Sequence, residues 1–466
     1  MPLPFHRQRF FQLLIFGCAL IVLLVGASHY SADPDIWWRL KTGEWILEHA
    51  QVPLYDIFSE GGAGRVWIEF NWLFDVIIYL LYKATGSYSG VVFYTVVMSS
   101  LIYLGVCSLI KDQNINDLAI NIISAVVVFG LLPVLTPRPW LISIFLYICV
   151  LKILLIYRKS QNNRLLYFLP PIFCLWANIH IQFLNGLVMI GIFTLEAGLT
   201  KRHITLRPVI IALCASCLAT LLNPYGYYLY SVVTQLNDPV YFSHINEFKM
   251  PDFSVPSYWT FPILALAATK LMVRQRRQMD ELFLSLLSLL GLVLAFRARR
   301  DIWIALIPLA TLVASLLPKQ TSELNLKHNS LILGTLVAFL IAFTPPVSMQ
   351  DISKHFPVEA VKFLKQQKLK GPIYNTFDWG GYLIWSLPEY PVAIDNRNII
   401  YGPKIFLQSL DTWRGLGAWQ LDSALLRSNI IIGPRHLPLN HYLQADPRFQ
   451  RIYSDDLTEI FTRISP

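Results

Sequence analysis

Apolar residues fill most of the chain between residues 11 and 346, whereas residues 351–466 mix polar and apolar positions as soluble domains do. A run of about 18 apolar residues is long enough to cross the hydrocarbon core of a bilayer. The pattern predicts an α-helical polytopic membrane region, residues 1–350, followed by a small folded domain, residues 351–466. Twelve candidate spans lie at about 11–30, 72–86, 88–110, 118–135, 140–157, 165–178, 183–199, 208–222, 258–273, 281–297, 302–317 and 330–346.

Basic loops orient these spans. Lys and Arg gather at 158–164, 200–207, 273–277 and 318–328, which the positive-inside rule places in the cytoplasm. The amino-terminus also carries basic residues, so we expect it inside and everything after residue 346 outside. Twelve crossings cannot satisfy both ends, so the expected count is 11 or 13, and the short 72–86 run is suspected to be interfacial or split.

The first apolar run, Phe11–Ser28, follows His6, Arg7 and Arg9. No small-x-small cleavage pattern leads from it into a polar mature chain, and many further spans follow. We therefore expect a retained first helix rather than a signal peptide.

The C-terminal part begins with an amphipathic helical pattern at Val358–Gln367. Strand-like runs follow at Pro391–Ile394 and Asn429–Gly433, and the chain ends with Asp456–Arg463. This order predicts a small α/β domain on the extracytoplasmic side.

Composition and charge narrow the function classes. The chain is 55% hydrophobic with a net charge of +9, but its basic residues follow the topology, so a nucleic-acid partner is not expected. All six cysteines lie in apolar runs, which argues against structural disulfides. Walker A, paired CxxC, GxSxG and HExxH patterns are absent, so soluble nucleotide-driven and zinc chemistry are not predicted.

The first outer loop, 31–71, carries candidate chemistry in its opening residues. Asp33 and Asp35 stand one residue apart beside the membrane surface, where paired carboxylates hold a divalent metal or deprotonate an acceptor hydroxyl. Trp37 and Trp38 follow, and such rings pack against a sugar. The alternative is that Asp33 caps a helix beginning at Pro34.

This D-x-D in a first outer loop resembles the GT-C superfamily of polyprenyl-phosphate-dependent membrane glycosyltransferases, which includes the oligosaccharyltransferase catalytic subunits. The rest of the chain resembles a bacterial subgroup of GT-C-like proteins with the pattern DPDxWWHLrtGewIl. This sequence reads DPDIWWRLKTGEWIL, followed by Glu69 in WIEFNWL, by Trp176-Ala-Asn-Ile-His180, by Asn223–Gly226 and by Trp379–Trp385 with Asp395 and Arg397.

The resemblance implies sugar transfer from a polyprenyl-phosphate donor, with Asp33 and Asp35 as general base or as ligands of Mg²⁺ or Mn²⁺. Arg39, however, stands where the pattern has His, so the metal requirement stays open. Trp37, Trp38, Arg39, Glu44 and Glu69 are then candidates for contact with the substrate.

Four arginines lie on the outer side against the positive-inside trend. Arg297, Arg299 and Arg300, beside Asp301, suit the phosphate of a lipid-linked donor because guanidinium groups bind phosphate through paired hydrogen bonds. Headgroup contact together with an Arg–Asp pair is the alternative. Arg138, between two prolines, is a second candidate.

Three further places could contact an acceptor. His180 lies near an outer helix end among polar residues, a setting that favours a cavity or a partner. Asp378 and Tyr382 flank Gly380 and Gly381 in an order that loosely resembles the acidic-aromatic-glycine signature of oligosaccharyltransferases. The alternative there is a tight turn before a strand at Tyr382–Trp385.

Asp395 and Arg397 form either a ligand contact or a salt-bridged turn, and the turn is favoured for an isolated pair.

We therefore expect an inverting membrane glycosyltransferase whose first outer loop and C-terminal domain form one active site. Its partners would be a polyprenyl-phosphate sugar, membrane lipid and a glycan, lipid or protein acceptor. The resemblance implies a bacterial inner membrane with the C-terminal domain in the periplasm. The alternatives are a lipid or polysaccharide transporter or flippase, which predicts internal repeats not found in the sequence, and a non-catalytic envelope-assembly scaffold.

Overall fold

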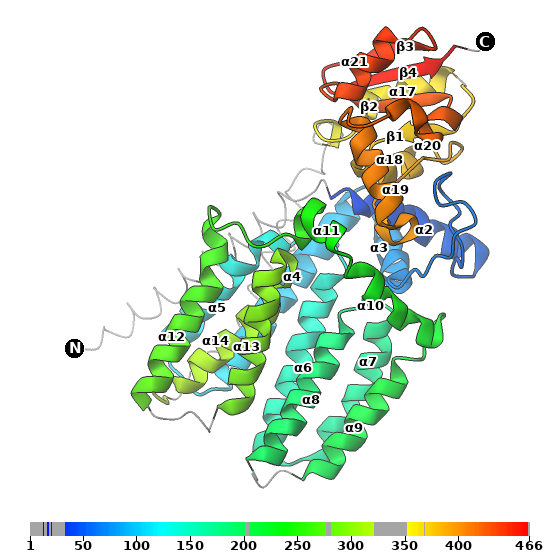
Figure 1. Cartoon of the computed structure of the whole chain (residues 1–466). Coiled ribbons are helices and arrows are strands. Elements are labelled where there is room, and N and C mark those ends of the chain that lie inside the picture. Colours follow the sequence, from blue (N-terminus) through cyan, green and yellow to red (C-terminus); the bar gives the residue numbers. More distant parts are fainter. Residues whose placement is uncertain are drawn as a thin grey trace. The chain divides into compact units, whose positions relative to one another are not determined.

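The computed structural model describes residues 33–200, 205–275, 281–320, 352–367 and 369–464, together with residues 13, 16, 17 and 20. The predicted spans 330–346 and most of 11–30, with His6, Arg7 and Arg9, lie outside the described residues. The chain forms two compact units (Figure 1). We name residues 1–30, 91–226 and 241–344 the helical unit, and residues 31–90, 227–240 and 345–466 the mixed unit.

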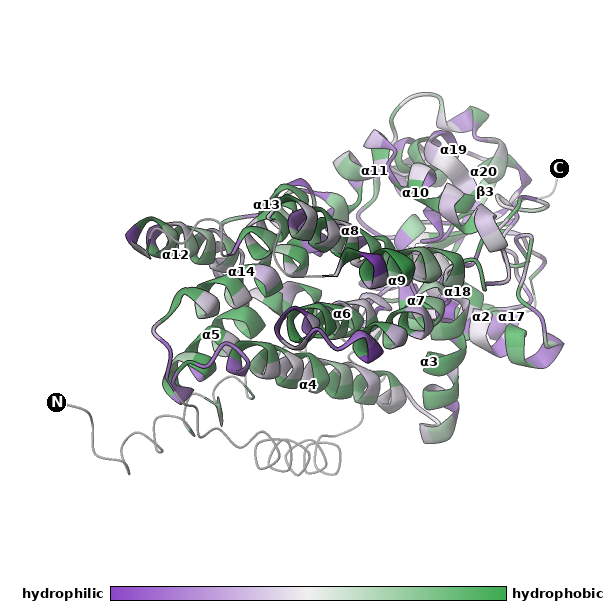
Figure 2. Cartoon of the chain, turned by 90° about the horizontal axis from the view of Figure 1, so that it is seen from below, coloured by the Kyte–Doolittle hydropathy of each residue, from purple (hydrophilic) through white to green (hydrophobic). Residues whose placement is uncertain are grey.

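The helical unit consists of apolar helices that follow the predicted spans closely. Among the described residues, three of its helices are long and apolar enough to cross a membrane, and Figure 2 shows how hydrophobic residues run along them. The bounds are α4 Ser89–Lys111, α5 Asp117–Leu131, α6 Trp140–Ser160, α7 Leu169–Ala177, α8 Phe183–Leu199, α9 Leu206–Ala219, α12 Thr260–Gln275, α13 Leu282–Arg297 and α14 Ile302–Leu316, with short 3-10 turns η1 Leu132–Val134, η2 Asn163–Phe168, η4 Asn246–Phe248, η5 Pro256–Trp259 and η6 Arg299–Asp301.

The centre of this unit is α14, because every residue from Ile302 to Leu316 is buried. A neighbour approaches it closely: a Cβ on Gly291 of α13 would lie 2.3 Å from the Ile304 carbonyl oxygen. A helix that is apolar all round and surrounded by other helices is typical of a membrane bundle.

The mixed unit joins the first outer loop to the C-terminal domain. Its α3 has 14 residues, which is about 21 Å of helix and shorter than a hydrocarbon core of about 30 Å. The helices are α2 Asp35–His49, α3 Trp72–Thr85, α10 Ser231–Leu236, α17 Val358–Gln367, α18 Phe377–Ser386, α19 Asn398–Trp413, α20 Ser423–Arg427 and α21 Pro438–Ala445, with η7 Trp419–Leu421. Three of the described elements cross the unit boundaries: η3 Gly226–Tyr230, α11 Pro239–His244 and α4, whose first two residues belong to the mixed unit.

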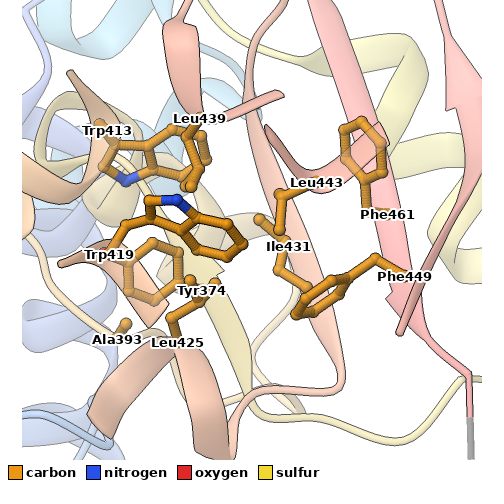
Figure 3. Packing of buried hydrophobic residues seen from close by; sticks show 10 residues of the cluster. All are labelled: Tyr374, Ala393, Trp413, Trp419, Leu425, Ile431, Leu439, Leu443, Phe449 and Phe461. Atoms are coloured by element: carbon orange, nitrogen blue, oxygen red, sulfur yellow. The ribbon is translucent and has the colours of Figure 1, made fainter. Parts of the chain in front are cut away.

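A four-stranded sheet organises the C-terminal part of this unit. The strands are β1 Ile373–Asn375, β2 Ile430–Pro434, β3 Phe449–Ser454 and β4 Thr458–Arg463, in the order β1-β2-β4-β3. β1 and β2 are parallel, and the other two pairs are antiparallel. The core gathers around Ile431 and includes Trp413 and Trp419, as Figure 3 shows. The C-terminal part therefore contains a small sheet, as expected.

One local prediction and one alternative are wrong. Pro391–Ile394 is not a strand, because only Val392 makes isolated bridges, to Ser59 and Ile373. Tyr382–Trp385 is not a strand either, since these residues belong to helix α18. The glycines before them are not in a turn: a Cβ on Gly380 would lie 2.1 Å from the Ile394 carbonyl oxygen. Close backbone packing, rather than chain reversal, explains the absence of a side chain at that position.

Candidate active site

The D-x-D carboxylates stand at the beginning of α2. A side-chain oxygen of Asp33 accepts the backbone N–H of Asp35 at 2.9 Å, but the helix begins at Asp35 and its N-cap residue is Pro34, so Asp33 is not the cap of a helix beginning at Pro34. Asp35 is the first residue of the helix, where the helix dipole stabilises a negative charge. Both residues are buried: Asp33 is 8% exposed and Asp35 is 9% exposed. The helix start therefore presents two ordered carboxylates of restricted exposure.

An aromatic cluster packs beside these carboxylates. The Trp37 ring lies 5.2 Å from Tyr382 and 5.5 Å from Tyr88, and Phe356 stacks on Tyr382 at 5.1 Å. Among the described residues, the buried indole N–H of Trp37 and the hydroxyl of Tyr88 have no hydrogen-bond partner. Two buried donors beside aromatic faces are suited to a ring-shaped ligand that carries hydroxyl groups.

Helix α18 lies directly against α2, so the acidic-aromatic-glycine segment and the D-x-D segment meet. A Cβ on Gly381 would lie 2.8 Å from the Pro34 carbonyl oxygen and 3.0 Å from the Trp38 ring. Tyr382 contributes to the aromatic cluster, whereas Asp378 is exposed in the first turn of α18. The structure thus brings Tyr382 to the D-x-D segment from more than 300 residues away in the sequence.

Arg39 is tied to a carboxylate that sequence reasoning missed. Its guanidinium lies 3.0 Å from Asp75 of α3, and both side chains are buried. Glu69 is near the same arginine; burial raises the pKa of Glu69, whereas Arg39 and the Asn71 backbone N–H lower it less strongly. The signal for Asp75 was its position as the one charge in the apolar segment WLFDVIIYLLY.

Asp395 and Arg397 belong to a buried cluster that crosses the mixed unit. Arg397 binds Asp395 at 2.6 Å and Asp56 at 2.8 Å, and the Tyr401 hydroxyl donates to Asp395. The backbone N–H of Arg397 also donates to Asp395, which is the favoured salt-bridged turn. Burial by itself would lower the pKa of Arg397, but Asp395 and Asp56 hold it well above its usual range. The pair is therefore not isolated, since Asp56 links it to the first outer loop.

In the helical unit, the four candidate arginines lie on neighbouring segments. Arg138 and Arg300 share Glu247, at 3.0 Å and 3.5 Å. Arg297 stacks over the Phe242 ring at 4.5 Å, and Arg299 donates to the Met250 carbonyl at 3.1 Å. Asp301 accepts a hydrogen bond from Gln182 at 2.9 Å and lies close enough to Arg300 and Arg297 to interact with their charges, as the alternative of an Arg–Asp pair supposed. Glu247 was not predicted, because nothing in its local sequence distinguishes it.

His180 forms a hydrogen-bonded chain inside the helical unit. Its Nδ1 lies 2.8 Å from the Ser143 hydroxyl, which also accepts the Trp176 indole N–H at 2.8 Å. Trp176 and Ser143 are fully buried, so this chain joins α6 to the end of α7. The contact gives His180 a packing role beside its predicted substrate role.

Glu44 lies apart from the D-x-D carboxylates. It is nine residues beyond Asp35 on the same helix, about 13 Å along the axis. There it binds Lys41 at 2.6 Å and accepts a hydrogen bond from Tyr79 at 3.1 Å.

The described residues contain no group of three or more His, Cys, Asp or Glu placed to hold a metal ion. Two carboxylates such as those of Asp33 and Asp35 would be enough for Mg²⁺, because this ion takes one or two carboxylates and completes its coordination with water and substrate phosphate. A cation bound there would polarise an oxygen that it coordinates.

No protein-family model matches the sequence. No curated protein matches it either. Among solved structures, the chain is similar to the archaeal oligosaccharyltransferase AglB from Archaeoglobus fulgidus in complex with an inhibitory peptide and a dolichol-phosphate. The match has a TM-score of 0.62 at 9% identity and covers 92% of this chain and 70% of that chain. The two proteins therefore share a fold.

Proposed function

We propose that this protein is an integral membrane glycosyltransferase. It moves a sugar from a polyprenyl-phosphate-linked donor to an acceptor on the extracytoplasmic side of a bacterial inner membrane. The observation that carries the proposal is the junction of α2 and α18, where the Asp33 and Asp35 carboxylates, an aromatic cluster and two buried donors lie in one unit of a GT-C-like fold. The dolichol-phosphate and peptide bound to AglB support a lipid-linked donor and a separate acceptor.

The reaction follows from this chemistry. Asp33 or Asp35 takes the proton of an acceptor hydroxyl as that oxygen attacks the anomeric carbon. The bond between this carbon and the donor phosphate oxygen breaks, and the polyprenyl phosphate leaves with the bonding electrons. Attack from the face opposite the phosphate inverts the configuration. Trp37 and Tyr382 offer ring faces to the sugar.

The donor phosphate is assigned to the arginines of the helical unit. Arg297, Arg299, Arg300 and Arg138 lie on neighbouring segments, and guanidinium groups suit phosphate oxygens. Asp378 stands exposed in the first turn of α18, where it is available to an acceptor. Arg39, Glu69, Asp395 and Arg397 act by positioning, since their charges are engaged inside the mixed unit.

The test is transfer of radiolabelled sugar from a panel of polyprenyl-phosphate sugars by the purified full chain, with envelope extract as acceptor. We expect Asp33→Asn or Asp35→Asn to reduce transfer by about 100-fold or more, the contribution of a positioned general base. Asp456→Asn is the matched control, because Asp456 is an exposed carboxylate of the same unit. Full transfer by both site variants would overturn the assignment, and no transfer from any donor would favour a scaffold or transporter.

A further inference from the structure

Glu247 bridges two arginines that come from separate segments. One carboxylate oxygen lies 3.0 Å from Nη1 of Arg138, and the other lies 3.5 Å from Nη1 of Arg300. Arg138 precedes α6, Glu247 lies in η4 and Arg300 lies in η6. A single anion thus holds two guanidinium groups, which is the arrangement that a phosphate group also forms.

Both guanidinium groups are held in place by aromatic rings. The Arg300 guanidinium carbon lies 3.8 Å from the centre of the Phe248 ring, and that of Arg138 lies 5.1 Å from the Trp140 ring. Arginine stacked on an aromatic ring directs its N–H groups along the edge of the guanidinium plane. The N–H groups are therefore oriented independently of Glu247, so another anion would find them already placed.

Positive charge exceeds negative charge around this bridge. Arg297 and Arg299 adjoin the same turn, and among the described residues Asp301 and Asp252 are further carboxylates beside them. Four guanidinium groups are thus accompanied by three carboxylates. A cluster with this excess favours an anion that carries more charge than one carboxylate, such as the phosphate monoester of the polyprenyl phosphate product, whereas the phosphodiester of the donor carries a single charge.

The Glu247 side chain can rotate away from the two arginines while the surrounding backbone keeps its place. Lys249 accepts the Arg299 backbone N–H at 2.8 Å, Met250 accepts an Arg299 side-chain N–H at 3.1 Å, and Phe248 is buried. The Glu247 side chain is 24% exposed, so a rotation toward solvent is open to it.

From these contacts we propose that Glu247 occupies the place of the lipid phosphate when no donor is bound. The inference rests on the proposed function, since the occupant is the phosphate of a polyprenyl chain. Binding of the phosphate displaces the carboxylate, and the return of the carboxylate aids release of the polyprenyl phosphate product. Glu247 thereby sets the affinity of the site for phosphate.

The test is direct binding of farnesyl phosphate to the full chain in detergent. We expect Glu247→Gln to bind about tenfold more tightly than wild type, because the competing charge is gone. Glu247→Asp, which keeps the charge but is shorter, should bind with intermediate affinity. Asp112→Asn is the matched control, since it removes the partly exposed carboxylate that pairs with Lys152 at 3.2 Å in the same unit, and its affinity should equal that of wild type.

The possible outcomes distinguish failure of the donor-site assignment from failure of the role proposed for Glu247. The Arg300→Gln variant should not bind farnesyl phosphate. If wild type and Arg300→Gln both fail to bind it, the donor-site assignment itself is overturned. If wild type binds and Glu247→Gln binds no more tightly, Glu247 is only a structural partner of the arginines and the inference is wrong. An affinity for inorganic phosphate equal to that for farnesyl phosphate would assign the site to free phosphate. An affinity for farnesol equal to that for farnesyl phosphate would show that only the hydrocarbon chain of the ligand is recognised. Either result overturns the proposal that a lipid phosphate occupies the site.

Discussion

Arg39 of α2 and Asp75 of α3 form an ion pair of 3.0 Å, with side chains 7% and 0% exposed. Gly43 lies one turn further along α2, where a Cβ would come within 2.1 Å of the Asp75 carbonyl oxygen. The same residue of α3 thus meets α2 through its side chain and its backbone. This fixes the helix that begins with the D-x-D carboxylates.

Removing one partner of this pair should destabilise the protein strongly. Asp75→Ala leaves the Arg39 charge buried, and the loss of one partner of a buried pair costs about 3–5 kcal/mol. Thermal unfolding of the purified chain in detergent measures the effect. The double variant Arg39→Met with Asp75→Leu should recover most of the loss, and single variants as stable as wild type would contradict the prediction.

Gly381→Ala should impair transfer by shifting α2. The new methyl group would meet the Pro34 carbonyl oxygen at 2.8 Å, closer than a Cβ normally approaches backbone, so the start of α2 must move. A displacement of about 1 Å near reacting groups can reduce a rate about 100-fold. Sugar transfer at equal folded yield is the measurement. Gly191→Ala is the control, because nothing lies within 4 Å of that Cβ in α8; equal activity of both variants would refute the effect.

Glu69 should make stability depend on pH. Burial raises its pKa, so above the usual glutamate pKa of about 4.3 the folded protein holds a proton that the unfolded chain releases. Stability due to this group is therefore fully present below that value and is lost as pH rises through the raised pKa. Glu69→Gln should remove this part of the pH dependence of the unfolding temperature. A profile unchanged by the substitution would show that Glu69 does not titrate in this way.

The Asp56–Arg397–Asp395 cluster should be strongly coupled. Arg397→Met leaves two carboxylates buried without their cation, at a cost of about 3–5 kcal/mol, whereas Asp56→Asn keeps Asp395 as a partner and costs less. A double-mutant cycle on unfolding should therefore give a coupling energy of about 1 kcal/mol or more. Additive effects would mean that Asp56 and Arg397 stabilise the unit separately.

Much of the helical architecture followed from the sequence. The predicted spans at 88–110, 140–157 and 183–199 became α4, α6 and α8 with ends displaced by a few residues. Long apolar runs allow few other structures, because backbone groups in lipid must be bonded within the helix. Val358–Gln367 was also predicted to its ends, because its periodicity is strong.

The strand considered as an alternative at Tyr382–Trp385 shows why short apolar runs mislead. Tyr382–Trp385 is as apolar and aromatic as a strand, and two glycines before it suggested a turn. Its helical conformation depends on α2 and the 394–395 backbone, against which Gly380 and Gly381 pack. Short apolar runs are ambiguous by pattern alone, so tertiary contact decided the outcome.

The candidate residues of the site could be picked out from the sequence, but the contacts between them could not. Asp33, Asp35, Trp37 and the four arginines stood out because charged or aromatic residues beside apolar runs are unusual. Asp75, Asp56 and Glu247 gained their importance only from partners distant in sequence, Arg39, Arg397 and Arg138. Hydrophobic patterning is local and so is legible in the sequence, whereas the pairing of buried charges depends on which segments the fold brings together.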